Sequence, residues 1–265
     1  MLLLKLALVP LSVWIASVAG RRFGHAISGV LAGLPMVAGP MIAVLLIDHD
    51  ADVVAPIAAA TVTAIPATLA FFVAFAHGAT RWRAPACLLA AAAAFFAVGA
   101  AMNALALPSP WAEMLALASP PLALGLMPAV EPLHGPVPIP RKEIALRMLG
   151  AAAIGALILH GANHFPPAVN GLLLSWPVTG TILPSFTLPL HGRVATVNLL
   201  RGFANGLSGF AVFFCALGAL LRHGVPEWAG FAIAIAAAVA TAWGIYRLRA
   251  RRHPPRAPSP PVSRA

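Results

Sequence analysis

Charged residues are scarce in this sequence. Asp, Glu, Lys and Arg together make up 9% of the 265 residues, whereas 60% are hydrophobic. A soluble domain draws about a quarter of its residues from these four types, because polar groups must cover its surface. The apolar residues also come in blocks of about 20, the length with which a helix crosses ~30 Å of hydrocarbon. The sequence therefore excludes an ordinary soluble fold and predicts an all-α integral membrane protein.

Acidic residues and cysteines are also few, seven and two respectively. Cys87 and Cys215 lie in separate apolar blocks, which indicates small buried side chains rather than a disulfide or a metal site. No carboxylate lies clearly in the middle of a block, so no site for ion coupling is visible. The net charge of +10 comes from short connections and a tail, which favours the lipid bilayer over nucleic acid as partner. We expect neither a metal nor another cofactor.

About nine apolar blocks predict transmembrane helices. They lie near residues 2–20, 24–47, 53–77, 84–106, 111–129, 144–162, 166–190, 194–221 and 227–247. The block at 111–129 is the weakest, because it carries Glu113 and two consecutive prolines. The first block imitates a signal peptide, yet the internal repeat described below requires it as a helix. The basic, proline-rich residues 248–265 are expected to be disordered.

The positions of the basic residues predict the orientation in the membrane. With nine spans and the N-terminus outside, the odd-numbered connections contain eight lysines and arginines and the tail six, which is 14 of the 17 in the chain. The outer connections hold Asp48, Asp50, Asp52 and Glu227, with Arg222 as the basic exception. Positive residues concentrate on the cytoplasmic side of membrane proteins. We therefore expect a multi-pass protein of a bacterial-type inner membrane whose C-terminus is cytoplasmic.

The sequence repeats itself at an offset of 142 residues. The matches include Phe23 with Phe165, Gly29 with Gly171, Pro35 with Pro177 and His49 with His191. Four blocks precede 111–129 and four follow it, so the repeat period is five helices, and an odd period inverts the second copy. We predict repeat 1 over 1–106, a linking helix and cytoplasmic loop over 107–142, and repeat 2 over 143–247.

The second helix of each repeat is predicted to be broken. Proline removes a backbone donor and glycine tolerates unwinding. Such residues recur at equivalent places of the two copies, and hydroxyl groups surround the second. They are Pro35 and Gly39 in the first copy and Ser175, Pro177, Thr179 and Thr181 in the second. A break within the bilayer must be buried or line a wet cavity, which makes these residues candidates for substrate binding. A simple kink between packed helices is the alternative.

The eighth block carries polar residues on one helical face. Asn198, Arg201, Asn205 and Ser208 follow each other at intervals of three and four residues. Arg201 lies well inside the block, and we predict that it binds substrate together with Asn198 and Asn205, because a charge there costs at least ~2.5–3.5 kcal/mol on insertion scales. Snorkelling to the cytoplasmic surface and a structural bond to carbonyl groups are the alternatives. On another face, Gly202, Gly206 and Gly209 favour close helix packing.

Together these features predict a small secondary transporter, and not an enzyme, that moves an anionic or hydrogen-bonding solute. An assembly subunit without ligand and an intramembrane enzyme using His160 and His164 are the alternatives. The run Leu183–Pro189 resembles the LP-x-x-T-x-P signature of urea transporters. It covers seven residues and has no counterpart in the first repeat, so it assigns no family. Homo-oligomerisation is left open by the sequence.

Overall fold

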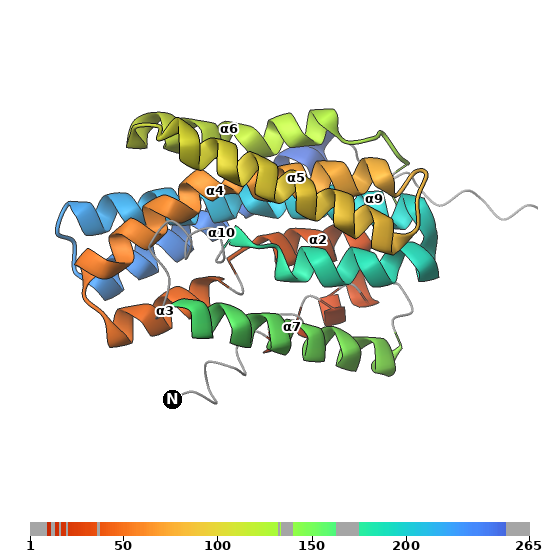
Figure 1. Cartoon of the computed structure of the whole chain (residues 1–265), viewed down its shortest axis with the longest axis horizontal. Coiled ribbons are helices and arrows are strands. Elements are labelled where there is room, and N and C mark those ends of the chain that lie inside the picture. Colours follow the sequence, from red (N-terminus) through yellow and green to blue (C-terminus); the bar gives the residue numbers. More distant parts are fainter. Residues whose placement is uncertain are drawn as a thin grey trace, which may run out of the picture.

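The computed structural model describes the chain as a bundle of helices (Figure 1), with no β-strand among the described residues. These are residues 10–11, 14–15, 17–19, 21–35, 38–131, 133, 140–162 and 175–252. The helices are α2 (His25–Gly33), α3 (Ala38–Asp48), α4 (Ala51–Gly78), α5 (Ala84–Leu105), α6 (Ser109–Leu126), α7 (Arg141–Ala162), α9 (Val178–Arg222) and α10 (Glu227–Arg252). Most of the predicted spans at 2–20 and 166–174 lie outside the described residues. The all-α fold class is confirmed.

Helix α9 is two helices joined at a sharp reversal. Its 45 residues include Gly192 at φ 78° and ψ −175°, a conformation that interrupts the helix. Glycine reaches a positive φ without the steric cost that a Cβ atom imposes. Figure 1 shows the chain turning back at this point. Residues 178–191 and 193–222 therefore run in opposite directions, as the two separate predicted blocks require.

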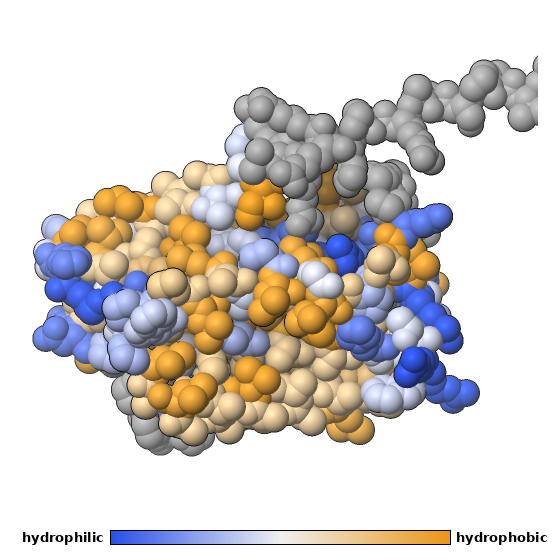
Figure 2. All heavy atoms as spheres, turned by 90° about the horizontal axis from the view of Figure 1, so that it is seen from above, coloured by the Kyte–Doolittle hydropathy of each residue, from blue (hydrophilic) through white to orange (hydrophobic). Residues whose placement is uncertain are grey.

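Five of the described helical stretches are long and apolar enough to cross a membrane. They are His25–Ile47 (across α2 and α3), Ala51–Gly78, Ala84–Leu105, Val178–Arg222 and Glu227–Ile245. Figure 2 shows hydrophilic residues gathered towards the two ends of the long axis, with a mostly apolar surface between them. Large exposed side chains such as Leu89, Phe96 and Val239 belong to this apolar surface. This distribution is that of a helical membrane protein.

The core is built from α4 and the second part of α9, which pack against each other. Their fully buried side chains are mainly aromatic: Phe71, Phe72 and Phe75 from α4, and Phe203, Phe213 and Phe214 from α9. The rings of Phe72 and Phe203 lie 5.0 Å apart. Aromatic pairs at such distances contribute about 0.5–1.5 kcal/mol beyond their buried area.

Polar contacts identify which connections lie at the same end of the bundle. The backbone N–H of Ala51 donates to Glu227 Oε1 at 3.2 Å, and Arg222 pairs with Glu113 at 2.8 Å. These contacts define one end, which we call the acidic end. His77 Nε2 lies 2.9 Å from the carbonyl oxygen of Leu126 at the other end. Since α4 starts where the second part of α9 finishes, the two helices are antiparallel.

The opposite end, which we call the basic end, contains the α4–α5 connection and the reversal in α9. Arg81 and Arg83 lie in the first of these and Arg193 follows the second, and all three are exposed. The rings of His25 and His191 lie 5.1 Å apart, which places the start of α2 at this end as well. Charges of opposite sign therefore concentrate at opposite ends of the bundle.

Helix α2 approaches the second part of α9 at backbone distance. A Cβ atom on Gly33 would overlap the carbonyl oxygen of Phe203 and lie 2.9 Å from Gly206 Cα. One on Gly29 would overlap the carbonyl oxygen of Leu199 and lie 3.0 Å from Gly202 Cα. The predicted small-residue stripe on α9 is thus confirmed as a packing surface at Gly202 and Gly206. Successive glycines of α2 meet successive glycines of α9, so these two helices run parallel.

Candidate functional site

The predicted break in the first repeat is present between α2 and α3. Helix α2 ends at Gly33, and Leu34 adopts an extended conformation at φ −69° and ψ 163°. Helix α3 begins at Ala38, and the N–H of Gly39 donates to the carbonyl oxygen of Pro35 at 2.7 Å. The helix therefore stops and restarts rather than bending, as the proline and the glycines favour.

A second break lies where the sequence predicts it, before α9. Ser175 is helical, Trp176 is a bend, and Pro177 has φ −77° and ψ 74° immediately before Val178 begins α9. Thr68 Oγ1 donates to the carbonyl oxygen of Ser175 at 2.6 Å. Ser175 Oγ donates in turn to the carbonyl oxygen of Thr61 at 3.2 Å. Hydroxyl groups thus supply bonds that the interrupted helix cannot make internally.

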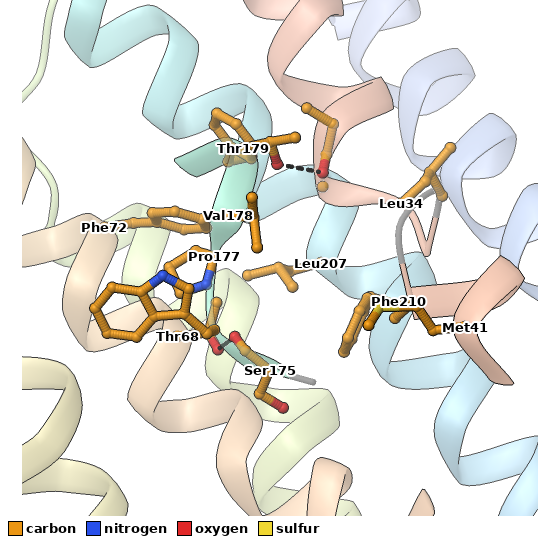
Figure 3. Close-up of a pocket in the computed structure, with 15 residues that line it drawn as sticks. Leu34, Met41, Thr68, Phe72, Ser175, Pro177, Val178, Thr179, Leu207 and Phe210 are labelled. Carbon is orange, nitrogen blue, oxygen red and sulfur yellow. Dashed lines mark hydrogen bonds between the residues drawn. The ribbon is translucent and has the colours of Figure 1, made fainter. Parts of the chain in front are cut away.

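The two breaks meet in the interior of the bundle. Thr179 Oγ1 donates to the carbonyl oxygen of Ala32 at 3.4 Å, which joins the first turn of α9 to the last turn of α2. Between the breaks lies a cavity of about 50 Å³. Figure 3 shows Thr68, Ser175 and Pro177 on one side of it and Leu34, Met41 and Phe210 on the other. The helices that start here direct their first backbone N–H groups towards this region.

The cavity is uncharged and mostly apolar. Among the described residues that line it, none carries a charge, and the polar side chains are the hydroxyls of Thr68, Ser175 and Thr179. Phe72 and Phe203 close it on the α4 and α9 sides. A cavity needs ~10–15 Å³ per water molecule. The space in this conformation therefore suits roughly three to five waters, or a solute of a few non-hydrogen atoms.

Trp176 forms the aromatic wall beside the second break. Its indole ring lies 5.0 Å from Phe95, 5.8 Å from Phe71 and 5.5 Å from Phe96, with the last pair stacked. This cluster joins α4 and α5 to the residue before Pro177. It fixes one edge of the break, because a large ring packed on three others cannot rotate without displacing them.

Three of the residues that we predicted to bind substrate line the cavity: Ser175, Pro177 and Thr179. Pro35 and Gly39 belong to the first break but do not line it, whereas their neighbours Leu34 and Ala38 do. Thr181 lies half a turn beyond Thr179, and its Oγ1 is buried without a hydrogen-bond partner. Their role in binding stays a prediction.

Arg201 and Asn198 face the end of α6 instead of the cavity. Arg201 Nη1 donates to the carbonyl oxygen of Leu124 at 3.1 Å, with those of Met127 and Pro128 at 3.5 and 3.4 Å. Asn198 Nδ2 donates to the carbonyl oxygen of Glu131 at 2.8 Å. The last carbonyls of a helix lack internal partners, and a cation there also opposes the helix dipole. The geometry is that of the structural carbonyl bond, one of the three alternatives for Arg201.

Asn205 lies one turn beyond Arg201 on the same face, and its Oδ1 is buried without a hydrogen-bond partner. None of Asn198, Arg201 and Asn205 lines the cavity. The polar stripe that the spacing predicts is therefore real, but it contacts the end of α6 and not the two breaks.

Replacing Arg201 should reduce stability rather than solute binding. Hydrogen bonds to charged groups contribute about 1.5–3 kcal/mol, so Arg201→Ala should lower the melting temperature of the purified protein. Arg201→Lys should be intermediate, because one ammonium cannot span carbonyls as a guanidinium does. Arg222→Ala is the matched control, since it breaks an exposed ion pair that contributes about 1 kcal/mol at most. Equal melting temperatures for Arg201→Ala and Arg222→Ala would contradict this role.

The sequence did not identify the cavity residues of α4. Thr68 and Phe72 line the cavity, yet they lie in a 28-residue helix that is apolar on every side. Thr61 and Thr68 are two turns apart on one face, and both contact Ser175. That spacing was the one available indication of which face of α4 points inwards.

Comparison with known proteins assigns no family: no protein-family model, no curated protein and no solved structure matches the chain. Within the described residues, no group of three or more His, Cys, Asp or Glu side chains could hold a metal ion. Function must therefore be inferred from the geometry.

Proposed function

We propose that the protein is a small permease that carries an uncharged, hydrogen-bonding solute of a few non-hydrogen atoms across the membrane. The observation that supports this is the meeting of two interrupted helices at one interior cavity. Interrupted helices expose backbone donors and acceptors within the hydrocarbon, where each unpaired group costs several kcal/mol. Paired breaks of this kind are a recurrent way to build a solute site near the membrane midplane.

The lining of the cavity favours a neutral solute over an anion. Its polar groups are three hydroxyls, and the nearest basic candidate, Arg201, is bound to carbonyl groups elsewhere. Helix N-termini can attract an anion, but a full charge in an apolar cavity without a counter-charge carries a large desolvation cost. A neutral amide or polyol can exchange hydrogen bonds with Thr68, Ser175 and Thr179 at much lower cost.

An inverted repeat is the architecture that we propose for this site. Shifted by 142 residues, α4 (51–78) corresponds to 193–220 and α5 (84–105) to 226–247, close to the second part of α9 and to α10. The corresponding helices α4 and the second part of α9 are antiparallel, as opposite orientation of the copies requires. The contact of Gly33 with the Phe203 carbonyl also has its counterpart in the hydrogen bond from Ser175 to the Thr61 carbonyl.

The proposed topology places the basic end in the cytoplasm and the acidic end outside the inner membrane. A fluorescent protein fused after Ala265 should therefore fluoresce, and alkaline phosphatase fused there should be inactive. Insertions in the connection 223–226 should give the opposite pair of results. Active phosphatase at Ala265 would overturn the nine-span arrangement and the orientation together.

Vesicle swelling tests the proposed function directly. Full-length protein reconstituted into liposomes should accelerate the entry of formamide, urea or glycerol, followed by stopped-flow light scattering. Formate and methylammonium are comparable in size but charged, and should enter no faster than in protein-free vesicles. If none of the neutral solutes enters faster than in protein-free vesicles, the permease proposal is wrong and a packing subunit is favoured.

A further inference from the structure

Two histidines meet at the basic end, away from the cavity. His25 is the first residue of α2 and is 5% exposed. His191 immediately precedes the reversal at Gly192. Their ring centroids are 5.1 Å apart and the ring planes are inclined by 57°. The Nε2 atom of His191 is buried and has no hydrogen-bond partner among the described residues. An imidazole nitrogen in this condition is unusual, because buried polar atoms are nearly always paired.

The separation suits a hydrogen bond between the two rings. A neutral imidazole offers one donor and one acceptor, whereas an imidazolium offers two donors. If one ring gains a proton, its additional N–H can donate to the acceptor nitrogen of the other after a small rotation. The orphan nitrogen of His191 then has a partner, and the charge is spread over two rings.

A second proton is disfavoured by the surrounding charges. Arg21 and Arg22 precede His25, and Arg193 follows His191. Helix α7, which packs against α9, begins with Arg141, Lys142 and Glu143, a group with a net positive charge. Two imidazolium ions at this separation would repel each other and most of these cations. The pair can therefore accept one proton but resists two, which is the behaviour of a coupled titration.

We propose that His25 and His191 form a binding site for a single, shared proton at the basic end of the bundle. The site joins the start of α2, which leads to the first break, to the turn at Gly192, which follows the second. Binding of the proton adds a bond between these elements. In a step that rests on the proposed function, this bond couples the proton to solute movement.

Histidine-selective nitrogen NMR of the full-length protein in detergent micelles tests the proton site. Between about pH 8 and pH 5, the ring signals of His25 and His191 should move together, each by about half of a full imidazole-to-imidazolium change. In His191→Gln the shared half-change of His25 should disappear. His49→Gln is the matched control, because His49 is exposed and lies at the position that corresponds to His191 in the first repeat. It should leave both signals unaltered.

Two results would overturn the proton site: full protonation of both rings independently by about pH 5, or no change in either ring. A second measurement separates this proposal from the permease. In liposomes with a pH gradient, solute entry should depend on the gradient in wild type and in His49→Gln but not in His191→Gln. A shared proton without solute entry would leave the proton site standing and reject the permease. Gradient-independent entry in wild type would support the permease and reject coupling.

Discussion

A single added methyl group at Gly206 should unfold much of the protein on modest heating. In Gly206→Ala the new Cβ atom overlaps the carbonyl oxygen of Val30 and lies 2.7 Å from Gly33 Cα. Both obstacles are backbone atoms, which cannot move aside as the end of a flexible side chain can. Overpacking of this kind costs typically about 1–3 kcal/mol and sometimes more, and the parallel pairing of α2 with α9 should separate.

Gly125→Ala is the matched control for this prediction. It adds the same methyl group to a helix, but nothing lies within 4 Å of the new atom. Alanine is favoured over glycine in helices by about 1 kcal/mol, so this variant should be neutral or slightly stabilised. The measurement is the fraction of protein that stays monodisperse in size-exclusion chromatography after heating. Equal melting curves for the two variants would show that α2 does not approach α9 at backbone distance.

Local chemistry explains why the two helix breaks could be predicted. A proline prevents the backbone bond that would continue a helix, whatever packs around it. Pro35 and Pro177 therefore marked both interruptions without any knowledge of their neighbours. The glycines at 202 and 206 were similarly visible as a packing surface, because small residues four positions apart are informative in membrane helices. Their partners on α2 were not identified, since nothing in the sequence says which helix lies opposite.

Features that depend on partners in space could not be predicted in the same way. Arg201 had three explanations, and the choice among them depends on what faces the guanidinium. The structure places the carbonyl groups at the end of α6 there. The cavity wall on α4 was missed for a related reason. In a soluble helix a polar face identifies the buried one, whereas a membrane helix is apolar towards lipid and core alike.

Filling the cavity should abolish solute entry without unfolding the protein. Met41 is 4% exposed and lines the cavity from α3. In Met41→Trp the indole adds six non-hydrogen atoms to the side chain, more than the roughly three to five waters that the cavity can hold. Entry of the neutral solute that wild type carries best should fall to the level of protein-free vesicles. Thr179→Val, which keeps the shape but removes the hydroxyl bonded to the Ala32 carbonyl, should reduce entry only partly.

Val239→Trp provides the control, because it introduces the same ring on α10 at a side chain that is 55% exposed. It should elute as a monodisperse peak and carry solute at the wild-type rate, which excludes a general effect of tryptophan on reconstitution. A Met41→Trp protein that is equally monodisperse but inactive would place the solute path at the two breaks. Undiminished entry through that folded variant would mean that solute crosses elsewhere. The meeting of the breaks would then be a matter of packing, because a path through a cavity of this size cannot survive its occupation by an indole ring.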